Sequence, residues 1–313
     1  MPLRVELKPS KITGVVLDID GTLFEPGETL VLKKYREHDN LLNFLNRLPP
    51  RRSRFTFATG RAYSGMKGIL MQVMNLRAFQ PPQKLKHRSM PLILYNGALI
   101  ISSDGRTLYK KWEIDKTSSV NIIGTALKYR LRPLIYCVNY EFLLGLEEKV
   151  FSVLRGDDES KMFDFNGLAI KNIAQSMISE IESPVAILLY GASSISPFDV
   201  SDMLVDIRDS ANANLFGDRV EITPKDANKG VALVELADIL DWDIDHVMVV
   251  GDSSNDIAMM RVAGIGVALA NSPPEVREMS DYVTDLSYTR GVNEAILKGV
   301  IRGDWKVKPK CRT

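Results

Sequence analysis

The run DIDGT at residues 18–22 carries two aspartates, Asp18 and Asp20, directly after an apolar stretch. Carboxylates two positions apart at the end of a strand can both reach one pocket once the chain turns. An EF-hand loop also opens with Asp-x-Asp, but it requires a glycine at its sixth position and a glutamate at its twelfth. Here the glycine is fourth and a strand precedes it, so we exclude an EF-hand. A capped turn without chemistry remains an alternative interpretation.

The run GDSSND at residues 251–256 supplies a second pair, Asp252 and Asp256, again after an apolar stretch. Two carboxylates four residues apart, at a turn that leads into a helix, can build a site for a hard cation. Mg²⁺ prefers oxygen ligands in octahedral geometry and keeps several waters. Helix capping by Asp or Ser is the alternative. Two acidic turns at the ends of separate strands of one sheet favour the cation site.

Two shorter runs, Thr59-Gly60 and Lys229-Gly230, complete the set of polar turns. A hydroxyl and a free backbone N–H at the end of a strand suit phosphate oxygens. A lysine beside a cluster of acids can neutralise a dianion. Each run is weak alone, since a single Lys-Gly is usually a surface lysine.

Short apolar runs rich in β-branched residues predict the strands that position these turns, because such runs are typical of buried parallel strands. Predicted strands and helices alternate along the chain, which favours an α/β fold with a parallel sheet and helices on both faces. Ligands bind such sheets at the carboxyl ends of the strands, so the turns that end the four predicted strands, at Asp18, Thr59-Gly60, Asn96-Gly97 and Gly251-Asp252, should line one rim. The predicted strands are 14–18, 55–58, 91–95 and 246–250, and the predicted helices are 30–48, 62–78, 229–240 and 255–263.

The middle of the chain, 114–223, has a different pattern, with apolar strands separated by polar segments of helical spacing. We predict an α+β domain on an antiparallel sheet, inserted into the parallel one. The domains are then 1–113 together with 224–313, and the insertion 114–223. The predicted strands of the insertion are 131–138, 141–146, 185–190 and 219–223, and its helices are 117–129 and 199–210.

Composition excludes several classes of protein. The chain of 313 residues has 40 Lys and Arg against 39 Asp and Glu, so its net charge of +1 gives no general reason to bind nucleic acid or an anionic membrane. Two cysteines, Cys137 and Cys311, rule out a disulfide framework and suit the reducing cytoplasm. No apolar run approaches the ~20 residues of a membrane span, and the charged N-terminus is unlike a secretory signal. Nothing predicts the oligomeric state.

Together the four polar turns resemble the four motifs of the haloacid dehalogenase (HAD) superfamily, in the same order. Further runs are similar to the Cof-type sugar-phosphate phosphatases of that superfamily: NGA at 96–98, EITPKDANKG at 221–230, NDIAMM at 255–260, GVALAN at 266–271 and Gly291-Val292. The resemblance covers the parallel domain nearly end to end and the middle only in length and coarse pattern. It implies a Rossmann-like core with an inserted α/β cap.

The resemblance also implies a function: a Mg²⁺-dependent phosphomonoester hydrolase acting on a small phosphorylated metabolite, a sugar phosphate above all, through an aspartyl-phosphate. Asp18 would be the nucleophile and Asp20 the acid–base residue. The implied Mg²⁺ ligands are the Asp18 and Asp252 carboxylates and the Asp20 backbone carbonyl, with Asp256 acting partly through water. The implied phosphate-binding residues are Thr59, Gly60, Lys229, Asn255 and Asn96.

Two other functions stay open on this evidence. A phosphosugar mutase such as phosphomannomutase shares the two-acid motif, but its cap carries arginines for a second phosphate. The insertion here has few, namely Arg130, Arg132, Arg155, Arg208 and Arg219. A catalytically silent binding protein on the same fold is disfavoured because the acidic and basic motif residues are all present.

Overall fold

The computed structural model describes residues 12–25, 45, 54–82, 89–141, 145–153, 164–165 and 168–302. The chain divides into two compact units. The first takes in Met1–Gly60, Lys67–Asp104 and Asn228–Thr313, and the second takes in Arg61–Met66 and Gly105–Ala227. The long segment of the second unit, Gly105–Ala227, extends several residues beyond the predicted insertion 114–223 at each end, and Arg61–Met66 joins it from outside. The predicted domain bounds and the role as a cap stay predictions.

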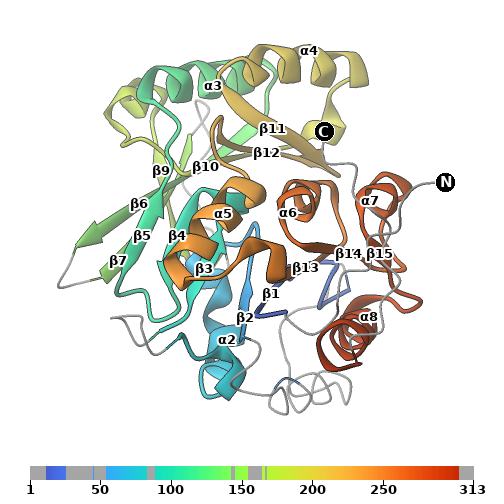
Figure 1. Cartoon of the computed structure of the whole chain (residues 1–313). Helices are drawn as coiled ribbons and strands as arrows, with labels where there is room; N and C mark the ends of the chain where they lie inside the picture. Colours follow the sequence, from blue (N-terminus) through green and yellow to red (C-terminus); the bar gives the residue numbers. More distant parts are fainter. Residues whose placement is uncertain are drawn as a thin grey trace. The chain divides into compact units, whose positions relative to one another are not determined.

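The first unit is built on a parallel sheet with the strand order β15-β14-β13-β1-β2. The two central strands, β1 and β13, are completely buried, because helices cover both faces of the sheet. In Figure 1, α5, α6 and α7 lie on one side of these strands, and α2 and α8 lie on the other. The strands are β1 (Gly14–Leu17), β2 (Arg54–Phe57), β13 (Val247–Gly251), β14 (Ile265–Ala268) and β15 (Tyr282–Val283). The helices are α2 (Tyr63–Val73), α5 (Lys229–Leu240), α6 (Ile257–Val262), α7 (Pro274–Met279) and α8 (Tyr288–Ile296).

The parallel architecture and the predicted strands 14–18, 55–58 and 246–250 are confirmed as β1, β2 and β13, whereas β14, β15, α7 and α8 were not predicted. Helices α5 and α6 match the predicted 229–240 and 255–263, but α2 ends at Val73, five residues before the predicted end. The predicted helix 30–48 lies outside the described residues, except for the buried, helical Leu45.

The predicted strand 91–95 forms, but with a partner that was not expected. Strand β3 (Pro91–Leu94) pairs antiparallel with β4 (Leu99–Ser102). It also adjoins the end of β2 in parallel, through a bridge between Ala58 and Ile93 and through Thr59 N, which donates to Ile93 O at 3.0 Å. Its apolar residues are buried in either arrangement, so the sequence pattern does not distinguish them. The turn after β3 brings Asn96 next to β2, where its N–H donates to Thr59 O at 3.0 Å.

The second unit contains a seven-stranded sheet with the order β11-β12-β10-β6-β7-β9-β8. It is antiparallel as predicted, except that β7 and β9 run parallel. The predicted strand 141–146 is wrong, because β6 ends at Glu141 and β7 begins at Gly145, whose φ of +83° suits a turn. The strands are β6 (Arg132–Glu141), β7 (Gly145–Val153), β8 (Asp164–Phe165), β9 (Leu168–Ile173), β10 (Ala186–Tyr190), β11 (Ala211–Phe216) and β12 (Arg219–Pro224), and β5 (Leu108–Lys111) precedes them.

Two helices, α3 (Lys116–Lys128) and α4 (Pro197–Arg208), cover one face of this sheet, close to their predicted ranges. Their apolar residues pack against every second residue of the strands, including Ile135 with Cys137 and Ile187 with Leu189. The neighbouring strand positions, including Tyr136, Tyr190 and Arg219, belong to the opposite face. Within the part of the chain that the structure describes, every helix is too short or too polar to cross a bilayer.

Candidate active site

Three neighbouring parallel strands end at the same edge of the first unit's sheet, and each is followed by a predicted site residue. Asp18 follows β1, Thr59 lies just past β2, and Asp252 follows β13. The carboxyl ends of parallel strands meet at one edge, so these side chains are brought together from distant parts of the sequence. The sequence predicted this convergence.

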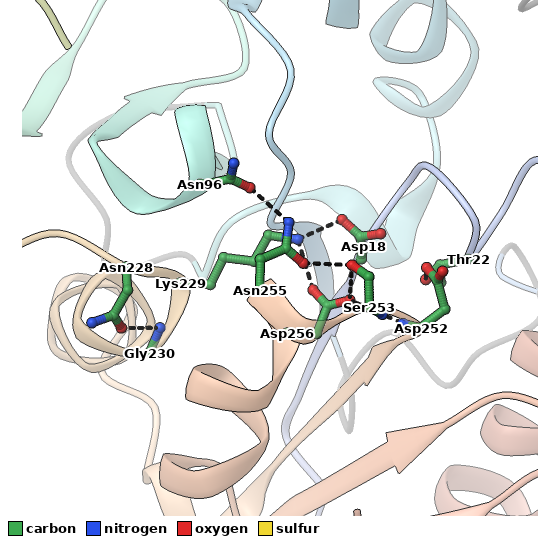
Figure 2. Close-up of polar contacts among 10 residues, drawn as sticks. All are labelled: Asp18, Thr22, Asn96, Asn228, Lys229, Gly230, Asp252, Ser253, Asn255 and Asp256. Carbon is green, nitrogen blue, oxygen red and sulfur yellow. Dashed lines mark hydrogen bonds and ion pairs between the residues drawn. The ribbon is translucent and has the colours of Figure 1, made fainter. Parts of the chain in front are cut away.

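Lys229 joins the two acidic turns. Its ammonium lies 2.6 Å from Asp18 Oδ1 and 2.7 Å from Asp256 Oδ1, and all three side chains are buried (Figure 2). Lys229 is the first residue of α5, whose N-terminus is capped by the neighbouring Asn228. The Asn228 side chain accepts from the N–H groups of Gly230 and Val231 at 2.9 and 3.0 Å.

Gly230 allows the start of α5, and with it Lys229, to lie close to α6. A Cβ at this position would lie 2.5 Å from the carbonyl oxygen of Ala258 in α6. Only glycine therefore allows α5 to approach α6 at this distance. Lys229 and Gly230 therefore belong to the packed contact between α5 and α6, and Lys229 is not an ordinary surface lysine.

Asp256 uses both carboxylate oxygens inside the protein. Oδ1 accepts from Lys229, and Oδ2 accepts from the backbone N–H groups of Asp252 and Ser253 at 2.9 and 3.0 Å. A Cβ on Gly251 would lie 2.4 Å from Asp256 Cγ, so this glycine makes room for the carboxylate. Asp256 thereby fixes the backbone that presents Asp252.

Asp252 is half-buried and faces the turn that follows Asp18. Its Oδ1 accepts from Thr22 Oγ1 at 2.7 Å. Gly21 has a φ of +81°, and a Cβ there would lie 2.2 Å from Asp252 Oδ2. Glycine is required both for this left-handed turn and for the approach of the carboxylate.

These three aspartates form the one group of side chains among the described residues that could hold a metal ion. Asp18, Asp252 and Asp256 each offer an oxygen within 4.8 Å of the others. Three carboxylates against the single ammonium of Lys229 leave a formal excess of two negative charges. An all-oxygen donor set with that excess fits a hard divalent cation.

The pKa values of these groups reflect the same excess of carboxylates over ammonium groups. Burial raises the pKa of Asp18 well above its ordinary value, with Lys229 opposing and the neighbouring carboxylates adding to the shift. Burial, with the repulsion of Asp256, raises the pKa of Asp252 to about 6. Burial alone would lower the pKa of Lys229, but its two carboxylate partners outweigh burial and raise it, so the lysine stays protonated.

Asp20 differs from this buried group in that it is exposed, although its charge still contributes to raising the pKa of Asp252. Its backbone forms a bridge with Phe24, and Gly21 N donates to Phe24 O at 2.8 Å, which closes a tight turn. An exposed carboxyl two residues from Asp18 can exchange protons with a substrate or water.

The two predicted amide residues, Asn96 and Asn255, contact each other. Asn255 Nδ2 donates to Asn96 Oδ1 at 3.0 Å, and Ser253 Oγ donates to Asn255 Oδ1 at 2.6 Å (Figure 2). A Cβ on Gly60 would lie 2.9 Å from Asn96 Oδ1, so Gly60 leaves the space that Asn96 fills. The amides thus link the turns after β2, β3 and β13, and their role in phosphate binding stays a prediction.

Three residues that position the site were not predicted: Thr22, Asn228 and Ser253. Asn228 had a readable signal, since asparagine directly before a helix is a preferred N-cap. The bond from Thr22 to Asp252 joins residues 230 positions apart, and no local pattern indicates it.

A family model of haloacid dehalogenase-like hydrolases matches residues 15–296. The phosphoglycolate phosphatase of Methanothermobacter thermautotrophicus is 41% identical over 80 residues, which is 26% of this chain and 36% of that protein. The 5-amino-6-(5-phospho-D-ribitylamino)uracil phosphatase YcsE of Bacillus subtilis is 40% identical over 82 residues, 26% of this chain and 33% of that protein. The matches thus span about a third of each of these two relatives.

The fold has solved counterparts along nearly its whole length. The HAD subclass IIB sugar phosphatase BT4131 superposes with a TM-score of 0.67 at 18% identity, over 91% of this chain and 97% of that chain. At this identity the likeness shows the fold alone. The family model, in contrast, runs through the chain from β1 to the end of α8 and includes all four polar turns. We conclude that this chain belongs to the haloacid dehalogenase-like hydrolase family.

Proposed function

We propose that this protein is a Mg²⁺-dependent phosphomonoester hydrolase that acts on a small phosphorylated metabolite, a sugar phosphate above all, through an aspartyl-phosphate intermediate. The observation that carries the proposal is the contact of one buried lysine with Asp18 and Asp256, beside Asp252. The relatives support the substrate class, since a sugar phosphatase and phosphatases of other small phosphorylated metabolites are among them.

The chemistry divides between two carboxyl groups. An Asp18 oxygen attacks phosphorus and forms the aspartyl-phosphate while the bond from phosphorus to the ester oxygen breaks. Asp20 gives its proton to that ester oxygen. It then takes a proton from water as the water oxygen attacks phosphorus, and the bond to Asp18 breaks to release phosphate. The exposure of Asp20 and the burial of Asp18 suit these two roles.

The metal would be held by Asp18 and Asp252, with the Asp20 backbone carbonyl as a further ligand. Asp256 already accepts hydrogen bonds from Lys229 and two backbone N–H groups, so we assign it to ordering the Asp252 backbone and to water-mediated contact. When bound, Mg²⁺ supplies the positive charge that offsets repulsion between carboxylates and a phosphate dianion. Lys229 holds Asp18 in place and adds its charge beside the phosphoryl group, with Thr59, Gly60, Asn96 and Asn255 as further phosphate contacts.

We propose that the second unit selects the substrate, as an inserted cap. All the phosphate and metal groups named above belong to the first unit. Substitutions in the second unit should therefore change the preference among sugar phosphates. They should leave kcat/KM for p-nitrophenyl phosphate within about tenfold, or roughly 1.4 kcal/mol of barrier. A proportional loss on every substrate would show that this unit contributes to catalysis instead.

The test of the activity is phosphate release from sugar phosphates, nucleotides, pyridoxal phosphate and p-nitrophenyl phosphate, with Mg²⁺ or with EDTA. Asp18→Asn keeps the side-chain shape but removes the attacking charge, so turnover should fall at least about 10³-fold with the fold retained. Asp243→Asn, at a surface aspartate of the same unit, serves as the matched control and should retain activity.

Two results would contradict the proposal: an Asp18→Asn variant within tenfold of wild type, or full activity in EDTA. Interconversion of sugar phosphates that depends on a bisphosphate, without phosphate release, would establish the mutase. Substrate binding without turnover of any ester would establish the silent binding protein.

A further inference from the structure

The turn that carries Asp20 is held in place by side chains from the C-terminal part of the first unit. Asn271 Nδ2 donates to Gly21 O at 2.9 Å, across 250 residues of sequence. Thr289 Oγ1 donates to Leu23 O at 2.7 Å, and this bond is buried. The carbonyls on both sides of the turn therefore have a partner outside it.

The Asn271 side chain is itself fixed at both ends. Its Oδ1 accepts from the N–H of Tyr288 at 3.2 Å, which leaves its NH₂ group toward Gly21 O. Tyr288 is the first residue of α8 and has a φ of +49°, which is unusual for a residue other than glycine. The preceding residue adds a backbone bond, since Ala270 N donates to Leu286 O at 3.2 Å.

Gly291 permits this arrangement. A Cβ there would lie 2.3 Å from Leu286 O, just before α8, and 2.9 Å from Leu269 Cδ2, so a larger residue would push α8 away from the segment that carries Leu269 and Asn271. The runs at 266–271 and at Gly291-Val292 stand out in the sequence, yet the phosphate and metal chemistry uses neither. Both runs contribute to the contacts that hold the Asp20 turn.

Asp20 depends on this turn for its orientation. Its side chain is exposed, whereas Gly21, Thr22 and Leu23 are buried and bonded to Asn271, Asp252 and Thr289, respectively. A rigid turn gives the exposed carboxyl a defined direction, and proton transfer requires such a direction.

We propose that Asn271 is a positioning residue for Asp20: through Gly21 and Tyr288 it holds the turn so that the Asp20 carboxyl reaches the ester oxygen of the substrate. The inference rests on the proposed phosphatase function and adds to it a residue outside the four motifs. It predicts that loss of the Asn271 amide weakens proton donation specifically, more than it weakens the attack by Asp18.

Leaving-group dependence separates these two steps. Esters of a strongly acidic phenol, such as 2,4-dinitrophenyl phosphate, need no proton on the departing oxygen, whereas alkyl phosphates do. A general acid contributes about 10²–10⁴-fold. For Asn271→Ala, kcat/KM for an alkyl phosphate should therefore fall about 10–100-fold, while that for 2,4-dinitrophenyl phosphate stays within about threefold of wild type. The quantity to compare is kcat/KM, because it reports only the steps up to and including the first irreversible one, the transfer of the phosphoryl group to Asp18.

Two further variants keep the test sharp. Asn271→Asp keeps the acceptor for Tyr288 N but loses the donor to Gly21 O, so it should show the same pattern without the loss of packing. Ser280→Ala removes a comparable hydrogen bond, from Ser280 Oγ to Arg277 O at 2.8 Å, away from the turn. It should leave both esters unchanged.

Equal losses on both esters, or no loss on either, would overturn the positioning role. Hydrogen exchange gives a readout that needs no activity, since the amides of residues 20–24 should exchange faster in Asn271→Ala than in wild type or Ser280→Ala. Unchanged exchange would refute the inference by itself. Failure of wild type to hydrolyse any phosphomonoester would instead refute the proposed function and leave the exchange result standing.

Discussion

Replacing Lys229 with methionine removes the ammonium that contacts Asp18 and Asp256 and leaves an unbranched apolar side chain of nearly the same length. At an effective dielectric constant of about 20, each of the contacts at 2.6 and 2.7 Å is worth about 6 kcal/mol of Coulomb energy. The cost of burying the three charges offsets most of that energy. Breaking a buried ion pair by removing one partner costs about 3–5 kcal/mol, because a charge is left unpaired. We expect Lys229→Met to lose that much free energy of unfolding at pH 8.

The loss should depend on pH in a defined direction. Burial already raises the pKa of Asp18 above its value in the unfolded chain, and Lys229 opposes that shift. In the variant this opposing charge is gone, so the pKa of Asp18 rises further. A carboxyl whose pKa is raised in the folded state costs stability above that pKa and recovers it on protonation. The difference in unfolding free energy between wild type and Lys229→Met should therefore shrink as the pH falls from 8 to 5.

Urea unfolding in EDTA at pH 8 and pH 5, followed by circular dichroism, measures both effects. Lys298→Met is the matched control. Lys298 also contacts two carboxylates, those of Glu294 and Asp285, but it is about one-third exposed. An exposed pair is worth about 0–1 kcal/mol, so this variant should lose little at either pH. Equal losses in the two variants, or a loss in Lys229→Met that grows toward pH 5, would refute the reasoning.

Three further predictions follow from named contacts. Asp252→Asn should raise the Mg²⁺ concentration needed for half-maximal activity and change the free energy of unfolding little. Asp256→Asn, which disturbs three hydrogen bonds, should also lose about 1–3 kcal/mol of that free energy in urea unfolding. A larger loss of stability in Asp252→Asn than in Asp256→Asn would contradict this division of roles. Gly21→Ala should lose both Mg²⁺-dependent activity and at least about 1 kcal/mol of stability, because of its left-handed φ and the clash with Asp252, and a fully active variant would contradict this. Burial raises the pKa of the Cys137 thiol to about 12, so it is protonated at pH 8. In Cys311→Ser, iodoacetamide should modify Cys137 much more slowly in the folded than in the urea-unfolded protein, and equal rates would show the thiol to be accessible.

Much of the fold and site could be predicted because the signals were local. The apolar runs of β1 and β13 are buried on both faces, and the polar residues that end them mark the binding edge. Burial does not identify all the neighbours of a strand: the parallel contact of 91–95 with the end of β2 was expected, but its antiparallel pairing with β4 was not. The edge strand β11, with the sequence ANANLF, has too little apolar character to stand out.

Contacts between distant residues were beyond prediction. The bonds from Thr22 to Asp252 and from Asn271 to Gly21 depend on which turns the sheet order brings together. A threonine or asparagine in a turn has many possible partners, and the sequence does not choose among them. The dual role of Asp256, with one oxygen for the lysine and one for the backbone, likewise becomes visible only in three dimensions.

The distance in sequence between the members of the site has a consequence for synthesis on the ribosome. Asp18 is made 211 residues before Lys229, and Gly21 is made 250 residues before Asn271. At about 5–20 residues per second, roughly 12–50 s pass between the synthesis of Gly21 and that of Asn271. Until β13 is made, β1 and β2 lack the strand that lies beside β1, whereas Gly105–Ala227, which contains its own core, is complete before β13 begins. The second unit can therefore fold before the parallel sheet of the first unit is assembled.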